Sequence, residues 1–301
     1  MKARAPGKVV LSGAYAVLEG APALVTAVDR YALVDTNRSG TILTEEMRAA
    51  GIQSAPLVDA SALRQDGRKL GLGSSAAILV AALAAFKLDE QPDLDDERLA
   101  ENVFVPALIA HRKAQGGGSG IDVAATAFGG TRLAHLSETG LQTESTTLPN
   151  QLELSIWATG VPASTGAMLT AVRALRESDP GCYRSRIRAQ AEAAERAANA
   201  CVRGDAPGLV LALAEQLLSL NELGMAARTP IVSSQILKWA KVAARQDAAL
   251  LPAGAGGGDV LVHARLRGAT NDLSGILAAS GLKRLDLRLA ARGVHAILGT
   301  D

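Results

Sequence analysis

A glycine- and serine-rich run from Gly71 to Ala77 leads directly into an apolar stretch that ends at Phe86. Closely spaced glycines let a backbone approach an anion, and the free amides and the dipole of a helix's first turn favour negative charge there. The run therefore predicts a phosphate-binding loop followed by a helix. No Gly-Lys-Ser or Gly-Lys-Thr follows it, so it is not a Walker A motif, and Ser75 and Ala76 interrupt the dinucleotide pattern Gly-x-Gly-x-x-Gly. The alternative is an ordinary helix cap formed by one of the two serines.

A second candidate segment lies near the N-terminus and contains a lysine. Lys8 precedes the apolar run from Val9 to Leu11, so it lies at the start of a predicted buried strand. Lysine is almost never fully buried without a partner, so one interpretation is a solvated side chain at the end of the strand. The other is a fixed cation beside an acceptor oxygen or a transferring phosphoryl group.

A glycine-rich turn connects two predicted helices farther along the chain. The segment from Gly116 to Gly120 contains four glycines and precedes Asp122. Ser119 and Asp122 have the spacing of a capping box, which gives the carboxylate one possible role, a structural one. A carboxylate at a helix start is also held ionised and oriented, and the glycines indicate backbone packed closely against a ligand. The second interpretation is therefore a catalytic Asp122.

A third glycine-rich run, from Gly254 to Gly258, precedes Asp259 and the apolar run from Val260 to Val262. In isolation this composition is typical of a hairpin turn. Three such runs in one chain, accompanied by a lysine and a carboxylate, indicate a nucleotide site more strongly than any one of them.

Taken together with the N-terminal segment around Lys8, these runs resemble, in their order along the chain, the motifs of the GHMP kinase superfamily, and within it those of the phosphomevalonate kinases. The superfamily motifs match PGKVVLSGAYAVLEG at residues 6–20, GLGSSAA at 71–77 and AGAGGGD at 253–259. The resemblance to the phosphomevalonate branch rests on AHRKAQGGGSGIDVAATAFGG at 110–130, WATGVPAST at 157–165 and GAGGGD at 254–259.

The resemblance implies an α+β fold with two lobes. These are a ribosomal S5 domain 2-like, ATP-binding N-terminal lobe over residues 1–160 and a ferredoxin-like C-terminal lobe over residues 161–301. It further implies transfer of the γ-phosphoryl group of ATP, with Mg²⁺, to a phosphorylated small molecule, mevalonate 5-phosphate, which gives the 5-diphosphate. The alternatives are a mevalonate kinase, another GHMP kinase, a related ATP-dependent decarboxylase, and a catalytically silent nucleotide-binding regulator.

The resemblance also assigns roles to the residues that match. Lys8 assists the acceptor oxygen, Asp122 is the catalytic carboxylate, and Ser75 is the Mg²⁺ ligand. The expected ATP-binding set is Lys69, Gly71, Leu72, Gly73, Ser74, Ser75 and Ala76. The expected acceptor-binding set is Ser119, Gly120, Arg132, Ser164, Thr165, Gly256 and Gly257. Lys8, Lys69 and Arg132 are the cations considered for an acceptor phosphate.

Three positions depart from the family pattern. Ala14 stands where members usually carry glutamate, which removes a carboxylate from near the site. His111 precedes Asp122 by the distance at which mevalonate kinases place a magnesium-binding glutamate, and histidine there favours the phosphomevalonate branch. Leu251-Pro252-Ala253 replaces a common Lys-Pro-Ser, which removes a cation and a hydroxyl.

Composition limits the classes of protein and partner. A chain of 301 residues exceeds the usual size of a single core, so two domains are expected. A net charge of +1 argues against nucleic acid as a partner. Cys182 and Cys201 fit no metal or redox motif, which indicates reduced thiols in a cytoplasmic protein. Apolar runs such as 76–86 are shorter than the roughly 20 residues of a membrane span, so no membrane partner is expected. The oligomeric state stays open.

Apolar periodicity and proline positions predict the secondary structure. Strands with turns at Gly20 and Gly40 are expected between residues 8 and 44, and further strands at 130–136, 152–159, 260–264 and 294–298. Helices are expected at 75–88, at 92–115 in two parts divided at Pro106, at 165–245 with breaks around Pro180, Pro207 and Pro230, and at 271–280.

Overall fold

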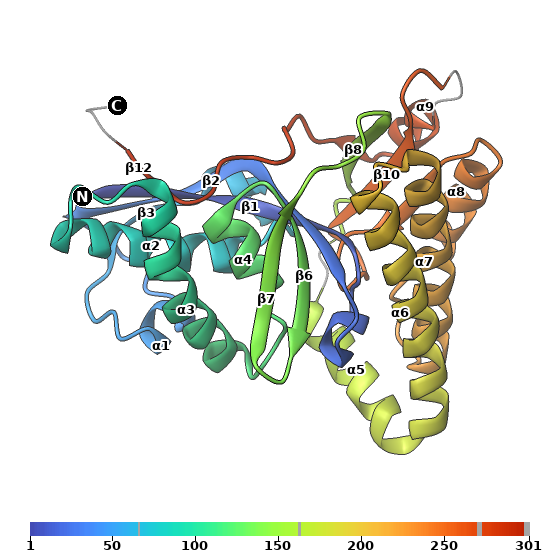
Figure 1. Cartoon of the computed structure of the whole chain (residues 1–301), viewed down its shortest axis with the longest axis horizontal. Helices are drawn as coiled ribbons and strands as arrows, with labels where there is room; N and C mark the ends of the chain where they lie inside the picture. The colour runs from blue at the N-terminus through green and yellow to red at the C-terminus, as the bar shows by residue number, and fades with distance from the viewer. Residues whose placement is uncertain (66, 162–163, 270–272, 298–301) are drawn as a thin grey trace.

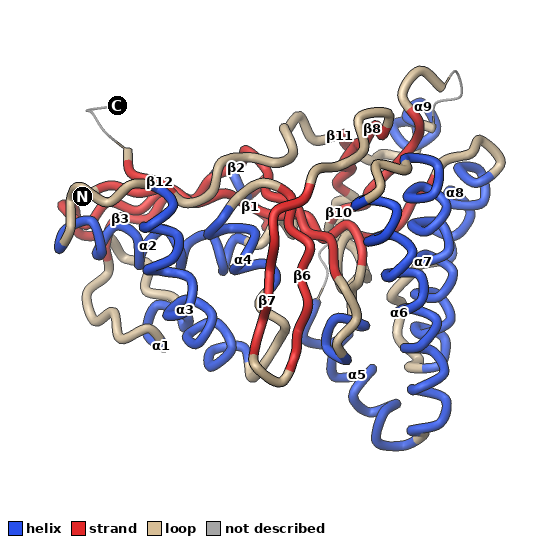
Figure 2. The backbone as a smooth tube through the Cα atoms, viewed as in Figure 1, coloured by secondary structure: helices blue, strands red, loops and turns tan. Residues whose placement is uncertain are grey.

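The computed structural model describes residues 1–65, 67–161, 164–269 and 273–297. A six-stranded antiparallel sheet occupies one half of the molecule and a four-stranded antiparallel sheet the other (Figure 1). Helices cover both sheets, and a helical bundle stands at the edge of the second half (Figure 2). Strands and helices do not alternate regularly, so the predicted α+β class with two lobes is confirmed.

The six-stranded sheet is built on one long antiparallel pair, β1 and β2, which brings Lys8 into register with Ala27. The strand order is β12-β1-β2-β6-β7, and β3 also pairs with β2. Its strands are β1 (Lys2–Ser12), β2 (Ala23–Ser39), β3 (Pro56–Asp59), β6 (Thr131–Ser137), β7 (Gly140–Thr146) and β12 (His295–Ala296).

Four helices lie on one face of this sheet (Figure 1). They are α1 (Glu45–Ala49), α2 (Ser74–Glu90), α3 (Asp96–Gln115) and α4 (Ile121–Phe128). The alanine-rich α2 packs against β1, β2 and α3, and apolar residues around much of its circumference are buried. Alanine has the best helix propensity and the smallest apolar side chain, so it permits this close packing. The predicted helix at 75–88 is confirmed.

The prediction that two helices divide at Pro106 is wrong, because α3 continues through this residue. A proline inside a helix removes one backbone hydrogen bond and leaves the carbonyl four residues earlier, here that of Asn102, without its helical partner. Both Pro106 and Asn102 are exposed, so water can satisfy this carbonyl. Val103 and Ala107, on the buried face, pack in the core and hold the helix together.

The four-stranded sheet has the order β11-β8-β10-β9. Its strands are β8 (Leu152–Ala158), β9 (Ala249–Pro252), β10 (Val260–Leu266) and β11 (Lys283–Arg284). The helices of this half are α5 (Thr165–Ser178), α6 (Pro180–Val202), α7 (Ala206–Ala226), α8 (Ser234–Ala244) and α9 (Ser274–Ala279). One face of α7 packs against β9, β10 and α6.

Three prolines mark the breaks in the helical region as predicted. Pro180 and Pro207 lie in the first turns of α6 and α7, where a missing amide hydrogen costs nothing. Asp179 and Asp205 cap these helices, each accepting a hydrogen bond from a first-turn amide. Pro230 lies between the end of α7 and the start of α8.

Smaller elements complete the fold. The 3-10 helices η1 (Ala16–Glu19) and η2 (Ser61–Leu63) and a hairpin of β4 (Arg64–Gln65) and β5 (Arg68–Lys69) lie between larger elements. β8 belongs to the second sheet, while β12, near the C-terminus, returns to pair with β1. The domain limits of 1–160 and 161–301 stay a prediction. The start of the helix predicted at 271–280 and the end of the strand predicted at 294–298 lie outside the described residues.

Among the described residues, α7 is the helix whose length and composition would allow a membrane span, with a mean hydropathy of 1.3 over its most apolar window. Half of that window is buried inside the protein, where Leu209, Leu213 and Leu220 belong to the main core cluster. The apolar character of α7 is therefore used in part for core packing.

Candidate active site

The three glycine-rich segments meet around a cavity of about 790 Å³. It is lined from β1, the loop before α2, the turn between α3 and α4, the start of α5 and the turn between β9 and β10. The predicted site residues in its lining are Lys8, Lys69, Gly71, Gly73, Ser74, Ser75, Ser119, Gly120, Asp122, Thr165 and Gly256. Segments far apart in the sequence thus contribute to one site, as the resemblance implied.

The loop before α2 has the conformation that an anion-binding loop requires. Gly71 and Gly73 have φ angles of +74° and +78°, in the left-handed region that favours glycine. A Cβ atom on Gly71 would lie 2.4 Å from the Cβ of Asp259, and one on Gly73 would lie 2.8 Å from the Cε of Lys8. Both glycines are therefore needed for the loop to pass these two side chains.

The first turn of α2 faces the cavity without a side-chain cap. Gly73 is the N-cap residue and no side chain caps it, so the predicted alternative of a serine cap is not what forms here. The first helical amide bond runs from Ala77 to Gly73, which leaves the amides of Ser74, Ser75 and Ala76 outside the helical ladder. These amides and the helix dipole favour a phosphate at this position.

Two members of the predicted loop set do not line the cavity. The side chains of Leu72 and Ala76 are buried in the hydrophobic core. The carbonyl of Leu72 accepts a 2.8 Å hydrogen bond from the amide of Lys8, which connects the loop to β1. Only backbone atoms of these two residues are available for a ligand.

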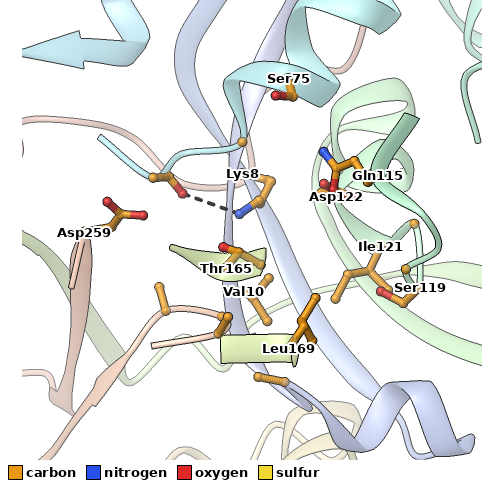
Figure 3. A pocket seen from close by; sticks show the side chains of 18 of the residues that line it. Lys8, Val10, Ser75, Gln115, Ser119, Ile121, Asp122, Thr165, Leu169 and Asp259 are labelled. Atoms are coloured by element: carbon orange, nitrogen blue, oxygen red, sulfur yellow. Dashed lines mark hydrogen bonds between the residues drawn. The ribbon is translucent and has the colours of Figure 1, made fainter. Parts of the chain in front are cut away.

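Lys8 lies at the centre of the site, between Asp122 and Asp259 (Figure 3). Its Nζ atom donates a hydrogen bond of 3.4 Å to the carbonyl of Gly71. Burial lowers the pKa of Lys8, while the two carboxylates act in the opposite direction without restoring the ordinary value. Lys8 is thus a desolvated cation placed by β1 beside the phosphate loop.

Asp122 lies in the first turn of α4, and its side chain is about a quarter exposed, at 23%. Its Oδ1 atom accepts a 3.0 Å hydrogen bond from the amide of Val123, and its Oδ2 atom lies 3.4 Å from Nε2 of His111. The N-cap residue of α4 is Gly120 with no side-chain cap, so the capping box between Ser119 and Asp122 does not form. The carboxylate is oriented from two sides and remains open to the cavity.

Polar groups behind Asp122 were not singled out as site residues from the sequence. His111 is buried on α3, and Gln115, one turn later, lies 3.1 Å from its Nε2 atom. Gln115 also donates a 3.4 Å hydrogen bond to Glu46 on α1. Burial raises the pKa of Glu46, but hydrogen bonds from its own backbone, Thr44 and Gln115 outweigh this effect and leave the pKa lowered. The i, i+4 spacing of His111 and Gln115 was the available sequence signal.

Tyr15 connects the N-terminal motif at residues 6–20 to the third glycine-rich run. Its hydroxyl donates a 2.5 Å hydrogen bond to the carbonyl of Ala255, in the turn between β9 and β10. Burial raises the pKa of Tyr15, so the phenol stays protonated and remains a donor at neutral pH. The residue has a φ of +63°, a conformation that is uncommon outside glycine and is typical of functional sites.

The third glycine-rich turn presents Asp259 to the phosphate loop. Asp259 ends the 253–259 motif but was not predicted as a site residue. Asp259 has a φ of +53°, and its side chain lies against Gly71. Gly256 lines the cavity, and a Cβ there would lie 2.3 Å from the carbonyl of Ile231. Gly257 is not in the lining, and its amide donates a 2.9 Å hydrogen bond to the same carbonyl.

The remaining predicted acceptor residues divide between the cavity and other places. Thr165 lines the cavity, whereas Ser164 is exposed and accepts the capping hydrogen bond from the amide of Ala167. Arg132 is not brought to the site. It lies on β6, where its guanidinium donates to the side chain and the carbonyl of Thr143 and stacks over the ring of Phe128.

One side of the cavity is apolar. Val10, Ile121 and Leu169 lie beyond Lys8, on the side away from Ser75 (Figure 3). On the other side, Lys69 and Arg68 line both this cavity and an adjoining one of about 220 Å³ that Asp259 also borders. The site therefore has a phosphate-binding loop with cations on one side and an aliphatic surface on the other.

The oxygen donors of the cavity suit a magnesium ion that arrives with nucleotide phosphates. Within residues 1–65, 67–161, 164–269 and 273–297, no group of three or more His, Cys, Asp or Glu side chains forms a metal site of its own. Nucleotide-bound Mg²⁺ keeps several waters and needs only one or two protein oxygens. The Ser75 hydroxyl and the Asp122 carboxylate fit this requirement.

Residues 60–130 match the family described as GHMP kinases N terminal domain. A phosphomevalonate kinase of Streptomyces sp. (strain CL190) is 24% identical over 368 residues, covering 96% of this chain and 97% of that protein. A mevalonate kinase of Archaeoglobus fulgidus is 30% identical over 152 residues, covering 44% of this chain and 52% of that protein.

Solved structures share the fold over nearly the whole chain. The Lin0012 protein of Listeria innocua has a TM-score of 0.80 at 24% identity, covering 98% of this chain and 99% of that one. The Streptococcus pneumoniae phosphomevalonate kinase, in complex with phosphomevalonate and AMPPNP, has a TM-score of 0.73 at 17% identity, covering 96% of this chain and 99% of that one. The resemblance stated from the sequence is thereby confirmed.

Proposed function

We propose that this chain is an ATP-dependent phosphotransferase acting on mevalonate 5-phosphate. It has the fold of the GHMP kinases and a segment that matches their N-terminal domain. The observation that carries the proposal is the meeting of Lys8, the uncapped first turn of α2 and Asp122 around one cavity. A cation, a phosphate-binding helix start and an oriented carboxylate are the groups that phosphoryl transfer needs for positioning and charge neutralisation.

In this proposal, the phosphates of ATP bind at the loop from Gly71 to Ser75. The free amides of the first turn of α2 hold the phosphate oxygens, and Lys8 neutralises charge on the transferring group. Mg²⁺, bound with the nucleotide, supplies further positive charge, and Ser75 and Asp122 are the side chains available to hold it. The adjoining cavity bordered by Lys69 leaves room for the rest of the nucleotide.

In the proposed reaction, an oxygen of the acceptor phosphate attacks the γ-phosphorus of ATP. The bond between that phosphorus and the bridging oxygen breaks, ADP leaves with the electron pair, and the product is mevalonate 5-diphosphate. The acceptor phosphate is already anionic at neutral pH, so little proton removal is required. The main tasks of Lys8 and Asp122 are then to orient the acceptor and to balance charge.

Two observations support mevalonate 5-phosphate as the acceptor. The Streptomyces relative named phosphomevalonate kinase aligns over almost the full length of both chains. The aliphatic surface of Val10, Ile121 and Leu169 suits the branched carbon body of such an acceptor.

Mevalonate itself is a second candidate acceptor, and the position of Arg132 favours it. This arginine was predicted to bind the acceptor phosphate but lies outside the cavity, where it is held by Thr143. An alcohol acceptor needs no such cation, and Asp122 would then serve as the general base that removes the hydroxyl proton. A cytoplasmic location and the absence of nucleic-acid and membrane partners, expected from the sequence, stay predictions.

A coupled assay of ADP release tests the proposal with mevalonate 5-phosphate, mevalonate and a panel of sugars as acceptors. We expect the largest kcat/KM with mevalonate 5-phosphate. When Mg²⁺ is chelated, we expect no ADP release with any of these acceptors. Activity on mevalonate with none on mevalonate 5-phosphate would overturn the acceptor assignment and leave the phosphotransferase assignment intact. No ADP release with any acceptor, from protein that binds MgATP, would favour the nucleotide-binding regulator.

A further inference from the structure

The face of α5 that lines the main cavity continues to a cation. Thr165 and Leu169 line the cavity from this helix, and Arg173 follows Leu169 at the same spacing. Residues four apart lie on one face of an α-helix, so the three side chains leave α5 on the same side. Arg173 is exposed, whereas Leu169 is half-buried. The polar end of this face therefore lies toward solvent.

The guanidinium of Arg173 lies against the glycine-rich turn between α3 and α4. A Cβ atom on Gly117 would lie 3.7 Å from Nη2 of Arg173. Gly118, the next residue of the turn, lines the cavity. Arg173 thus reaches from α5 to the turn on the other side, at the edge of the cavity.

This guanidinium is available to a ligand, unlike its neighbours. Among the residues that the structure describes, no hydrogen bond or ion pair to Arg173 is present. Arg176, on the same helix, donates a 3.0 Å hydrogen bond to Glu19. Arg112, on α3, donates to two carbonyls of the turn at 3.1 and 2.8 Å. Arg112 therefore fixes the turn, and Arg173 is the arginine beside it that can pair with an external anion.

The cations that line the cavity lie away from its aliphatic side. Lys8 lies beside the phosphate loop, and Arg68 and Lys69 also border the adjoining cavity. Within the described part of the chain, the lining has no other lysine or arginine, so the aliphatic side opposite Ser75 has none (Figure 3). A carboxylate is costly to remove from water without a partner. An acidic ligand on that side needs a cation from beyond the lining, and Arg173 lies there.

We propose that Arg173 binds a carboxylate at the end of the acceptor remote from the reacting oxygen. This inference rests on the proposed function and defines the class of acceptor, an aliphatic acid that carries a phosphate or a hydroxyl at the other end of its chain. The reacting end lies at Lys8, the carbon body lies along Leu169, and the carboxylate meets the guanidinium beside Gly117. The planar guanidinium matches the two oxygens of a carboxylate.

The spacing along α5 suits an acceptor of this kind. At 1.5 Å per residue, Thr165, Leu169 and Arg173 follow one another at intervals of roughly 6 Å along the helix axis. A short aliphatic chain with an anionic group at each end covers most of the two intervals, and the long arginine side chain covers the rest. A neutral sugar offers no carboxylate to this position. Mevalonate 5-phosphate and mevalonate both do, so the inference holds for either acceptor.

Steady-state kinetics with two acceptors that differ in the carboxylate tests the proposal. The first is mevalonate 5-phosphate, and the second is 3-hydroxy-3-methylbutyl phosphate, which keeps the phosphate, the hydroxyl and the branched carbon. Arg173→Ala should raise the KM of mevalonate 5-phosphate about tenfold and leave kcat and the KM of ATP within about twofold. The KM of the analogue without a carboxylate should not change. Arg173→Lys should retain part of the affinity for the acid, because it keeps the charge but loses the planar fork.

Arg188→Ala is the matched control, because Arg188 is an exposed arginine on α6 outside the lining of the cavity. It should change neither acceptor's KM. Ionic strength gives a second measurement, since salt weakens an exposed ion pair. Added salt should raise the KM of mevalonate 5-phosphate more steeply for the wild-type protein than for Arg173→Ala. An equal rise in KM for both acceptors in Arg173→Ala would show that Arg173 supports the turn or the phosphate. No change with either would show a solvated side chain. Each of these two results overturns the proposal.

Calorimetric titration without nucleotide separates this inference from the proposed function. Weaker binding of mevalonate 5-phosphate by Arg173→Ala, with unchanged binding of the analogue, supports the inference even when no phosphoryl transfer is found. Phosphoryl transfer to mevalonate 5-phosphate that Arg173→Ala leaves unchanged supports the proposed function and overturns the inference. A wild-type protein that binds neither mevalonate 5-phosphate nor mevalonate overturns both.

Discussion

Nε2 of His111 lies 3.4 Å from Oδ2 of Asp122, and this contact joins the carboxylate in the cavity to Gln115 and Glu46 behind it. The contact spans two helices, since His111 belongs to α3 and Asp122 to α4. His111 thus acts as a positioning residue that limits the directions in which the carboxylate can face.

Replacing His111 should therefore reduce catalysis without weakening nucleotide binding. We expect His111→Leu to lower kcat about tenfold, since one of two contacts that orient Asp122 is lost, and to leave the MgATP dissociation constant within a few-fold. His111→Asn, which keeps a hydrogen-bonding group, should retain more activity. Added to Asp122→Asn, the same change should have almost no further effect, because coupled residues are not additive. If His111→Leu lowers kcat by the same factor in the wild-type protein and in Asp122→Asn, His111 does not act through Asp122.

Gly71 should be intolerant of a side chain for a reason that can be separated from its backbone angle. Gly71→Ala places a Cβ 2.4 Å from that of Asp259, whereas Gly51→Ala meets nothing within 4 Å at a similar φ of +83°. Gly51→Ala should lower the free energy of unfolding by about 1 to 2 kcal/mol, the cost of a left-handed alanine. Gly71→Ala should lower it further and should abolish the protection that MgATP gives against thermal unfolding. Equal shifts for the two variants, with protection retained, would contradict the close packing described here.

The lowered pKa of Lys8 predicts the alkaline limb of the pH profile. The protonated amine is the useful form, so kcat/KM should fall as pH rises through the pKa of Lys8, at a value below the 10.5 of an ordinary lysine. Lys8→Arg should retain some activity and move this limb to higher pH, because a guanidinium stays charged. Lys8→Met should lose at least ~100-fold in kcat/KM. A limb unchanged by Lys8→Arg would mean that another group titrates there.

The hydrogen bond from Tyr15 to Ala255 should stabilise the folded chain and the shape of the third glycine turn. Tyr15→Phe is expected to lower the free energy of unfolding by about 1 kcal/mol and to raise the acceptor KM, since the turn loses its contact with η1. Tyr31→Phe is the control, because its exposed hydroxyl donates a longer bond of 3.3 Å to Arg292, and a change within about 0.5 kcal/mol is expected. Chemical denaturation and steady-state kinetics measure both quantities. If Tyr15→Phe and Tyr31→Phe change the free energy of unfolding and the acceptor KM equally, the hydrogen bond from Tyr15 to Ala255 does not shape the turn.

The sequence predicted the phosphate loop, Lys8 and Asp122 because their chemistry depends on neighbours close in the chain. Gly71 and Gly73 directly precede the helix whose amides they expose. Lys8 directly precedes the apolar run from Val9 to Leu11, although β1 begins six residues earlier than that run predicted, at Lys2. Tyr15 and Asp259 were not predicted as site residues, since their partners Ala255 and Gly71 are remote in sequence. Only the folded chain brings such pairs together.

Arg132 and Pro106 are two residues for which prediction from neighbouring sequence was wrong. Arg132 follows directly after a motif, but the twist and register of β6 turn its side chain toward Thr143 on β7 and not toward the cavity. Pro106 leaves the carbonyl of Asn102 without its helical partner, but Asn102 is exposed, so water can satisfy that carbonyl and α3 continues. Both errors concern the direction in which a residue faces, which sequence order does not specify.

Transfer of a labelled γ-phosphoryl group is the most direct test of a phosphotransferase at this cavity. The protein is mixed with Mg²⁺, ATP carrying label in its γ-phosphate, and either mevalonate 5-phosphate or mevalonate, and the products are separated. Our account predicts label in mevalonate 5-diphosphate from wild-type protein, and at least about tenfold slower transfer by Asp122→Asn at unchanged ATP affinity. Label that stays in ATP or appears only as inorganic phosphate with every acceptor, or equal transfer by Asp122→Asn, would contradict it.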